Sequence, residues 1–345
     1  MSNILMVLLV VALAILMICC AQIDDNVNHL FDIQNTNAMR GFWCIIVVIG
    51  HTPLEYVNKV QDLILCFGYI GITFFFMTSG FGLALSQARD PQQINCFWRK
   101  HLPKLVISCW ILNIFNAILC YPSQGQKSFI SLFKIDIWVI WLLVCYFFFW
   151  IMHKAIRKKS ILCETMIMIC IVAFSVTIYM IKLVNNYSFT AWITECYGFI
   201  WGILLARYHK KFYDLFIDRW EVKLTISLLV SLVLGIGYIC FKPVAFWGDY
   251  LLKIILGLSI ITFILISNVK ISYGNKINQF LARCSFEIYL VHGSAYEVVK
   301  ILSKERLSSG MFIWMSIIVS VILACIAHEI IKKILSLSIF HYTKN

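Results

Sequence analysis

An arginine and a histidine, Arg40 and His51, lie in one apolar run, MRGFWCIIVVIGH. On a helix, the eleven-residue step between them turns about 1100°, roughly 20° past three turns, so their side chains share one face. The same step covers about 16 Å. In a bilayer with a hydrocarbon core of about 30 Å, we expect Arg40 at the interface and His51 near mid-depth. An ionisable residue at that depth indicates a functional site.

These two residue types suit a defined chemistry. A guanidinium can bind a phosphate through two hydrogen bonds, and a neutral imidazole can take a proton from a hydroxyl and return it to a leaving group. We therefore expect Arg40 to bind a phosphate-bearing donor while His51 acts deeper in the membrane. Glu55, expected one turn beyond His51, could orient the imidazole or bind substrate. The alternative is an arginine that snorkels and a histidine that only bonds a neighbouring helix.

A glycine-rich run, GYIGITFFFMTSGFGLAL, follows this first motif. Its four glycines, Gly68, Gly71, Gly80 and Gly82, predict close contact with neighbouring helices. The hydroxyl of Ser79 is a candidate to bind the substrate inside the bundle. Tight helix packing without a ligand is the alternative for the glycines.

A basic string, CFWRKHLPKL, stands at the start of the next apolar run. It supplies Arg99, Lys100 and Lys104, of which the two lysines lie four residues apart and share a helix face. The three cations could bind the phosphates of a nucleotide-like cofactor. The alternative is ordinary anchoring by positive charge at the cytoplasmic surface.

A late motif, CSFEIYLVHG, contains two further candidates to bind substrate. Tyr289 and His292 lie three residues apart, so they share a helix face. Polar contact between helices is the alternative. Of the remaining ionisable residues, Glu195 could be buried, and His328 is expected at the membrane interface.

The composition predicts a polytopic integral membrane protein. Hydrophobic residues make up 61% of the 345 residues, and only 13% are charged, far from the balance of a soluble domain. The short gaps between apolar runs exclude a sizeable soluble domain. We expect an all-α fold with a ten-helix core and one extra N-terminal hydrophobic helix. The eleven expected segments lie near 3–20, 41–57, 63–85, 105–120, 135–152, 161–183, 190–206, 222–241, 250–267, 280–299 and 311–331.

The basic residues alternate between the two sides of this arrangement. With Arg40 on the cytoplasmic side, 20 of the 29 Lys and Arg residues fall on that side, as the positive-inside rule requires. The net charge of +12 therefore indicates a membrane orientation rather than a nucleic-acid partner. We expect a protein integral to the cytoplasmic (inner) membrane, in contact with membrane lipid.

The predicted division is an N-terminal hydrophobic segment and linker at 1–30, a membrane domain at 31–335 and a cytoplasmic tail at 336–345. The N-terminal segment lacks a basic stretch, which favours an uncleaved helix over a removed leader, its alternative. Many of the fourteen cysteines lie inside apolar runs, and no CxxC pair occurs. Buried free cysteine behaves as a small hydrophobe, so we expect neither a disulfide framework nor a metal site.

In their order, these motifs resemble the acyltransferase family 3 membrane proteins. That family has an arginine and a histidine in its first core helix with ten residues between them, matched by Arg40 and His51. It has a segment of the form GxxxFFxxSGF, here GITFFFMTSGF, then a basic string, and a late SYxIYLxH motif, here SFEIYLVH. The resemblance covers roughly 31–331. The proline usual after the basic string is absent here, and the extra N-terminal helix is unusual.

The resemblance implies a ten-helix core that moves an acyl group, often acetyl, from a coenzyme A thioester to a carbohydrate hydroxyl. The acceptor would be a cell-envelope carbohydrate of a bacterium, such as O-antigen, capsule or exopolysaccharide. It implies that His51 is catalytic, as general base or as transient acyl carrier, and that Arg40 handles acyl-CoA. Acetyl-CoA or another acyl-CoA is then the co-substrate, and no metal is expected.

Two rival hypotheses stay open at the level of the sequence. A transporter or flippase for an envelope glycan precursor would also use glycine-rich helices and buried ionisable residues. A catalytically silent partner in a glycan-synthesis complex is the other.

Overall fold

The computed structural model describes residues 2–19, 21–23, 30–57, 59–156, 160–185, 191–303 and 307–336. Helices form nearly all of its regular structure, and two short strands, β1 (Gln22–Ile23) and β2 (Ile271–Ser272), pair antiparallel. The all-α fold predicted from the sequence is confirmed. Most of the tail predicted at 336–345, and part of the linker before residue 31, lie outside the described residues.

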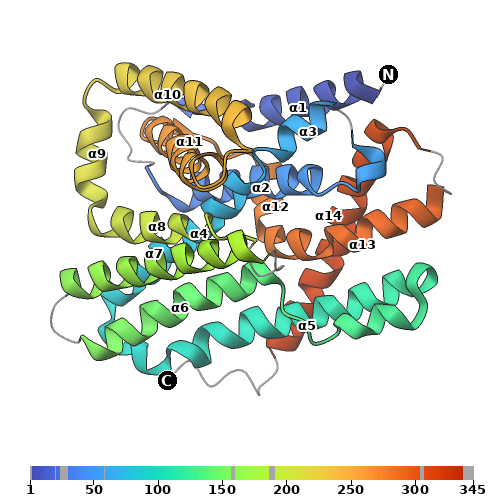
Figure 1. Cartoon of the computed structure of the whole chain (residues 1–345), viewed down its shortest axis with the longest axis horizontal. Coiled ribbons are helices and arrows are strands. Elements are labelled where there is room, and N and C mark those ends of the chain that lie inside the picture. The colour runs from blue at the N-terminus through green and yellow to red at the C-terminus, as the bar shows by residue number, and fades with distance from the viewer. Residues whose placement is uncertain are drawn as a thin grey trace.

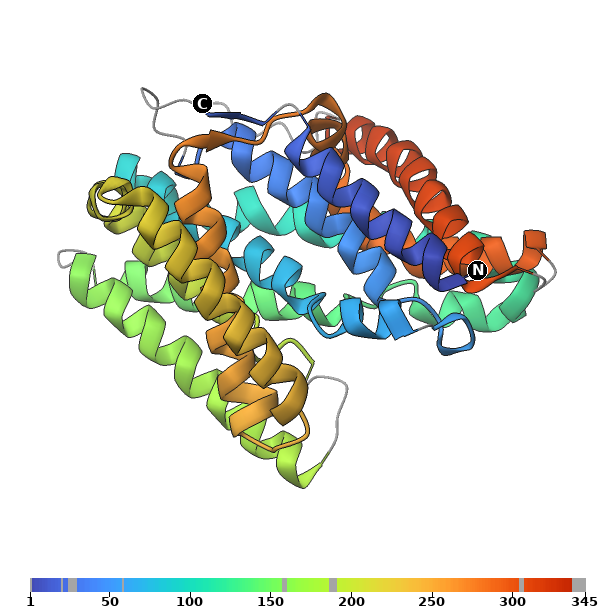
Figure 2. The ribbon, with the colours of Figure 1, turned by 90° about the horizontal axis from the view of Figure 1, so that it is seen from above.

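The long helices pack side by side, and the short helix α9 runs across the direction of its neighbours α8 and α10 (Figure 1). Seen from above, α10 and α11 lie together on one side of the bundle, and α1 lies between them and α14 (Figure 2). The helices are α1 (Ser2–Ile18), α2 (Ile33–Gly50), α3 (Lys59–Leu65), α4 (Tyr69–Arg89), α5 (Phe97–Gln124), α6 (Ile137–Ala155), α7 (Ser160–Val184), α8 (Tyr197–Arg207), α9 (His209–Ile217), α10 (Trp220–Phe241), α11 (Lys253–Asn268), α12 (Lys276–Arg283), α13 (Ser285–Ser303) and α14 (Ser309–Leu335).

Seven helical stretches among the described residues are long and apolar enough to cross a membrane. They contain α4, α5, α6, α7, α10, α11 and α14. Three more predicted core segments form α2, α8 and α13, which are shorter or more polar; α8 has 11 residues, and α13 carries Glu287, Glu297 and Lys300. The chain is therefore a polytopic helical membrane protein, and the count of ten core spans stays a prediction.

Apolar side chains on the outside of the bundle fit contact with lipid. On α10, Leu229, Leu232, Val233 and Ile236 are each more than half exposed. In water, such a continuous apolar face would be a liability. Lipid tails are as apolar as leucine, so the same face is stable in a bilayer.

The first core helix begins and ends earlier than the predicted 41–57. Asp32 caps its N-terminus, where the Asp32 carboxylate accepts a hydrogen bond of 2.6 Å from the backbone N–H of Asn35. The helix ends at Gly50, three residues before Pro53, whose ring disfavours helical geometry in the preceding residue. The apolar pattern did not predict the first two turns of α2, because their residues are polar and pack on other parts of the protein.

Two other predicted segments are interrupted. The segment expected at 280–299 breaks at Cys284 into α12 and α13. The segment expected at 190–206 becomes helical only from Tyr197, and the described residues before it form turns. Both breaks leave backbone N–H and C=O groups without helical hydrogen bonds. A membrane protein tolerates such irregular backbone where other parts of the protein surround it.

Glycines allow α4 and α8 to approach closely. A Cβ atom at Gly80 would overlap the backbone carbonyl of Phe199, and one at Gly198 would overlap that of Thr73. Backbone atoms cannot move aside as a flexible side chain can, so these positions require glycine. The predicted packing role is confirmed for Gly80, whereas Gly82 has open space beside it.

The predicted N-terminal hydrophobic helix is present as α1, which packs against α14 and α3. Leu9, Leu13 and Met17 are its buried side chains. The side-chain amide of Asn275 donates to the carbonyl of Leu16, which satisfies one of the free carbonyls at the helix end. Whether this helix is retained or removed in the mature protein stays a prediction.

One end of the bundle is rich in positive charge. Arg89, Lys154 and Arg207 lie in the last turns of α4, α6 and α8, which meet there. We call this the basic end. That this end faces the cytoplasm, as the positive-inside rule predicts, stays a prediction.

Candidate active site

Helix α2 carries the two residues that the sequence singles out. Arg40 lies seven residues inside the helix, about 10 Å from its first residue, and His51 caps its other end. Arg40 Nη2 donates to Ser285 Oγ at 3.1 Å, and the guanidinium carbon lies 5.7 Å from the centre of the Phe75 ring. Arg40 therefore contacts α4 and α13 from its place on α2, and its expected position at the membrane interface stays a prediction.

The last turn of α2 fixes the position of His51. A helix leaves its final carbonyl groups without helical partners, and here side chains fill that role. His51 Nδ1 lies 2.9 Å from the Val47 carbonyl oxygen, and the Tyr296 hydroxyl donates to the Val48 carbonyl. Because a carbonyl oxygen only accepts, Nδ1 carries the proton and Nε2 carries the lone pair. His51 is thus held in the tautomer that a general base acting through Nε2 needs.

Three aromatic rings surround the His51 imidazole. The ring centroids of His51 and His292 are 5.0 Å apart, those of His51 and Trp192 6.1 Å, and those of His51 and Tyr289 6.3 Å. His292 Nδ1 lies 2.5 Å from the Tyr289 carbonyl oxygen, so its proton also sits on Nδ1. The structure therefore brings together His51, Tyr289 and His292, and both imidazoles keep an Nε2 lone pair for a ligand.

A cavity of about 440 Å³ extends inward from the basic end. We call it the Arg40 cavity. Polar groups from three helices line it, namely Arg40 of α2, Ser79 of α4, and His101 and Lys104 of α5. Three of the residues predicted to bind substrate or cofactor therefore meet in one place, and His101 joins them although the sequence did not point to it.

The helix register shows which residues lie deepest in the Arg40 cavity. Along α2, its lining begins with Ile33 at the start of the helix and ends with Arg40. Along α6, which runs in the opposite direction, the lining extends from Tyr146 to Trp138, the second residue of the helix. Lys104 is exposed near the mouth. Arg40 and Trp138 therefore lie at the inner end, farthest from the basic end.

The other two cations of the basic string lie outside the lining of the Arg40 cavity. Arg99 and Lys100 are exposed, and Lys100 Nζ donates to Gln93 Oε1 at 3.1 Å. They lie at the same end of the bundle as Lys104, since all three belong to the first two turns of α5.

Glu55 does not make the contact expected of it. Because α2 ends at Gly50, Glu55 lies in a separate 3-10 turn, Leu54–Tyr56, and not one helical turn beyond His51. Its carboxylate pairs with Lys300 Nζ of α13 at 2.5 Å and is more than half exposed. The hydrogen bond from Lys300 lowers the pKa of the Glu55 carboxyl. The predicted orientation of His51 by Glu55 is therefore wrong.

Two buried acids pair in ways that the sequence did not predict. Glu195 is fully buried, and its Oε1 lies 2.6 Å from Lys253 Nζ of α11. Glu287 is buried on α13, and its Oε1 lies 2.9 Å from His328 Nδ1 of α14. His328 thus joins α14 to α13, a contact that the sequence did not indicate, and its interfacial position stays a prediction. Both pairs join distant segments, so local spacing carried no signal of them.

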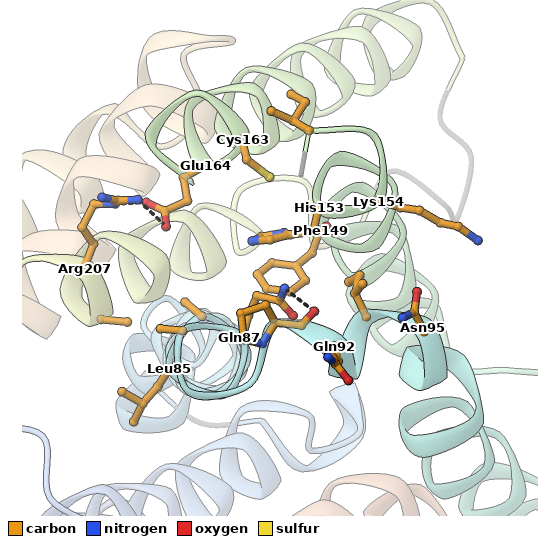
Figure 3. A pocket seen from close by; sticks show the side chains of 16 residues that line it. Leu85, Gln87, Gln92, Asn95, Phe149, His153, Lys154, Cys163, Glu164 and Arg207 are labelled. Atoms are coloured by element: carbon orange, nitrogen blue, oxygen red, sulfur yellow. Dashed lines mark hydrogen bonds and ion pairs between the residues drawn. The ribbon is translucent and has the colours of Figure 1, made fainter. Parts of the chain in front are cut away.

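A second cavity, of about 730 Å³, opens at the basic end between α4, α6, α7 and α8 (Figure 3). Its main charged feature is the pair of Arg207 and Glu164, in which Nη2 donates to Oε1 at 2.9 Å. His153 lies beside it, with Nδ1 2.9 Å from the Phe149 carbonyl oxygen. The paired charges neutralise each other, so this larger cavity is a weaker candidate for an anionic donor than the Arg40 cavity.

Among the described residues, no group of three or more His, Cys, Asp or Glu side chains is placed to hold a metal ion. The cysteines in this part of the chain are all free. The ring neighbours of His51 are an indole, a phenol and a second imidazole, and the Asp136 carboxylate is close enough to interact with His51 electrostatically.

A family model for an acyltransferase domain, Acyl_transf_3, matches residues 33–329. The chain belongs to this acyltransferase family. The match begins at the first residue of α2 and ends within α14, so it contains every candidate site residue and leaves out α1. No curated protein and no solved structure matches the chain.

Family membership gives the chain its reaction class, the transfer of an acyl group. The resemblance found in the sequence is thus confirmed over most of the chain. Together with the seven membrane-spanning candidates, it makes this protein an integral membrane acyltransferase.

Proposed function

We propose that this acyltransferase moves an acyl group, acetyl in the simplest case, from acyl-CoA to a hydroxyl of a cell-envelope carbohydrate. The acceptor would be an O-antigen, capsule or exopolysaccharide, and the site of action the cytoplasmic membrane of a bacterium. The observation that carries the proposal is the placement of two imidazoles, those of His51 and His292, beyond the inner end of a cavity that Arg40 and Lys104 line.

In this proposal, the Arg40 cavity binds acyl-CoA with the phosphates at its mouth and the acyl end at its inner end. Lys104 lies near the mouth, where it would meet the phosphates of the donor. Arg40 lies deeper, where its guanidinium would bind the pantetheine arm or the thioester. Arg99 and Lys100, exposed at the same end, would meet the nucleotide part outside the cavity.

His51 would serve as general base on the acceptor. Its Nε2 takes the proton of the acceptor hydroxyl while the hydroxyl oxygen attacks the thioester carbonyl carbon. The carbon–sulfur bond then breaks, and the coenzyme A thiolate leaves and regains a proton from His51. The Val47 carbonyl stabilises the imidazolium in between, because it accepts a hydrogen bond from Nδ1 at the negative end of the α2 dipole.

The residues beside His51 would bind the carbohydrate. His292 presents a lone pair on Nε2, so it can accept a hydrogen bond from a second hydroxyl of the sugar but cannot donate one to an oxyanion while neutral. Ser79, which lines the Arg40 cavity, offers a hydroxyl to the donor side. Glu55, paired with Lys300 at the surface, is the weakest of the substrate-binding candidates.

Coenzyme A release by the purified protein tests this function. The protein in nanodiscs receives acetyl-CoA with or without candidate glycans, and free thiol is measured over time. Release that depends on both the glycan and His51 supports acyl transfer to that glycan. A transporter would take up or expose the glycan without releasing thiol, and that result would replace the proposal.

A further inference from the structure

Trp138 is a buried residue of α6 whose indole lines the Arg40 cavity. It is 5% exposed, and its Nε1 is buried without a hydrogen-bond partner among the described residues. A buried N–H that lacks a partner costs about 1–3 kcal/mol. A phenylalanine would fill most of the same space without that cost, so the indole N–H needs another explanation.

The backbone fixes Trp138 at a definite point. Asp136 caps the N-terminus of α6, and its Oδ1 accepts a hydrogen bond of 3.1 Å from the Trp138 backbone N–H. Leu142 and Tyr146, four and eight residues further on, line the cavity from the same helix face. Trp138 therefore forms the inner end of that face.

The indole also lies between the Arg40 cavity and the histidine pair. Its ring is edge-to-face with Tyr289 at 4.7 Å and with Phe286 at 5.5 Å between centroids. Tyr289 in turn is 6.3 Å from His51. Trp138 therefore lines the cavity on one side and contacts, through Tyr289, the surroundings of His51 on the other.

A second unpartnered donor lines the same cavity. Arg40 Nε is buried without a partner among the described residues, although Nη2 of the same side chain binds Ser285. Two N–H groups at the inner end of one cavity thus lack acceptors. A thioester presents one strong acceptor at its reacting end, the carbonyl oxygen, which is neutral at first and gains negative charge as the hydroxyl attacks.

We propose that the Trp138 indole N–H donates a hydrogen bond to the thioester carbonyl oxygen of the acyl donor and stabilises the oxyanion formed during transfer. This assignment rests on the proposed function, in which the donor is acyl-CoA. The bond strengthens as charge develops on the oxygen, so it favours the transition state over the bound substrate. Trp138 is in this account a catalytic residue that no sequence motif indicated.

The test compares two coenzyme A thioethers that cannot react. S-acetonyl-CoA keeps a carbonyl oxygen close to the position of the thioester oxygen, and S-ethyl-CoA has none. Their affinities are measured by calorimetry for the wild type and for Trp138→Phe, which keeps an aromatic ring and removes the N–H. The matched control is Trp43→Phe, because Trp43 Nε1 is also buried without a partner but Trp43 lies outside the cavity lining.

We expect Trp138→Phe to weaken S-acetonyl-CoA by about fivefold, the effect of one neutral hydrogen bond, and to leave S-ethyl-CoA unchanged. In the reaction, kcat/KM should fall by about a hundredfold, as when one oxyanion donor is lost. Trp43→Phe should change neither quantity. The substitution removes no hydrogen bond of the free protein, and any loss of ring packing against Tyr289 and Phe286 would affect both thioethers alike.

Two results would overturn the assignment. If Trp138→Phe weakens both thioethers equally, the indole acts by packing and not through its N–H. If it weakens neither and kcat/KM is kept, the carbonyl does not bind there. Failure of the wild type to bind coenzyme A or either thioether would instead remove the proposed donor, and the role of Trp138 with it.

Discussion

The imidazole rings of His51 and His292 lie 5.0 Å apart between centroids, and each has Nδ1 within 3 Å of a backbone carbonyl oxygen. The two rings come from α2 and α13, which are separated by more than 230 residues of sequence. This arrangement leaves both Nε2 atoms as acceptors in the neutral state. An acceptor sugar with two neighbouring hydroxyls could bind both rings, donating one hydrogen bond to each.

Replacement of His51 should abolish the chemistry and keep the fold. Loss of a general base typically lowers kcat by about 10²–10⁴. His51→Gln should show this loss with the affinity for S-ethyl-CoA unchanged, because His51 lies outside the donor cavity, and with the thermal unfolding temperature unchanged, because a glutamine amide can also donate to the Val47 carbonyl. If the purified variant retains kcat, His51 has no catalytic role.

The two roles of His51 differ in a single-turnover experiment. A general base transfers nothing without an acceptor, whereas an acyl carrier would take label from radiolabelled acetyl-CoA and hold it as an acyl-imidazole. We expect no protein-bound label after a rapid acid quench without glycan. Label that is lost in His51→Gln would instead establish the covalent route.

Arg40 should act mainly through donor binding. Arg40→Ala should raise KM for acyl-CoA by at least about tenfold, the value of one charge-assisted hydrogen bond, with a smaller change in kcat. Arg89→Ala is the matched control, because Arg89 is an exposed arginine of the basic end outside the cavity lining. A collapse of kcat at unchanged KM would show that Arg40 does not hold the donor.

The glycine contact of α4 and α8 should be sensitive to a single methyl group. Gly198→Ala should destabilise the protein by about 1–3 kcal/mol, because the new Cβ meets the backbone of Thr73. Gly82→Ala should be neutral or gain up to about 1 kcal/mol of helix propensity, since its Cβ meets open space. Thermal unfolding in one detergent compares the two. Equal stability of both variants would refute the close approach of these helices.

The two acid–lysine pairs should contribute very differently to stability. Glu195→Ala should cost about 3–5 kcal/mol, because it leaves the ammonium of Lys253 without its buried partner. Glu55→Gln should cost little, since exposed pairs contribute little in water. Thermal unfolding at neutral pH measures the stability of both variants. A larger loss of stability from Glu55→Gln than from Glu195→Ala would contradict the finding that the Glu195 pair is buried and the Glu55 pair exposed.

The Glu55 pair also predicts a pH dependence. Its pKa is lowered in the folded protein by the hydrogen bond from Lys300, so its stabilisation is present above the ordinary carboxyl pKa of about 4.3. The stabilisation is lost as pH falls through the lower, folded value. The small difference between wild type and Glu55→Gln should therefore vanish in acid.

The sequence predicted the class of fold because apolar runs of membrane length are a local property. It placed Arg40 and His51 on one helix, and it indicated Ser79, Lys104, Tyr289 and His292 through motifs. Pro53 is a local signal that α2 ends before it, but the sequence could not place the end at Gly50, because one of the last carbonyls of the helix is capped by Tyr296, far away in the chain. That missed helix end is also why Glu55 was assigned wrongly.

The role of Trp138 could not be predicted from the sequence either, because it depends on contacts with distant segments. The segment predicted near 135–152 contains α6, which begins after the Asp136 cap. Nothing local distinguished Trp138 from the other tryptophans of the chain, because its significance lies in contact with Tyr289 and in its place at the inner end of the Arg40 cavity. The pairs of Glu195 with Lys253 and of Glu287 with His328 are long-range for the same reason.

The most direct measurement is the O-acetyl content of the envelope glycan, by mass spectrometry and NMR, in a deletion strain that carries wild-type or His51→Ala protein at matched membrane levels. The account predicts that only the wild type restores an alkali-labile acetyl ester on a sugar hydroxyl. Full restoration by His51→Ala would contradict the central claim that this histidine carries out the transfer.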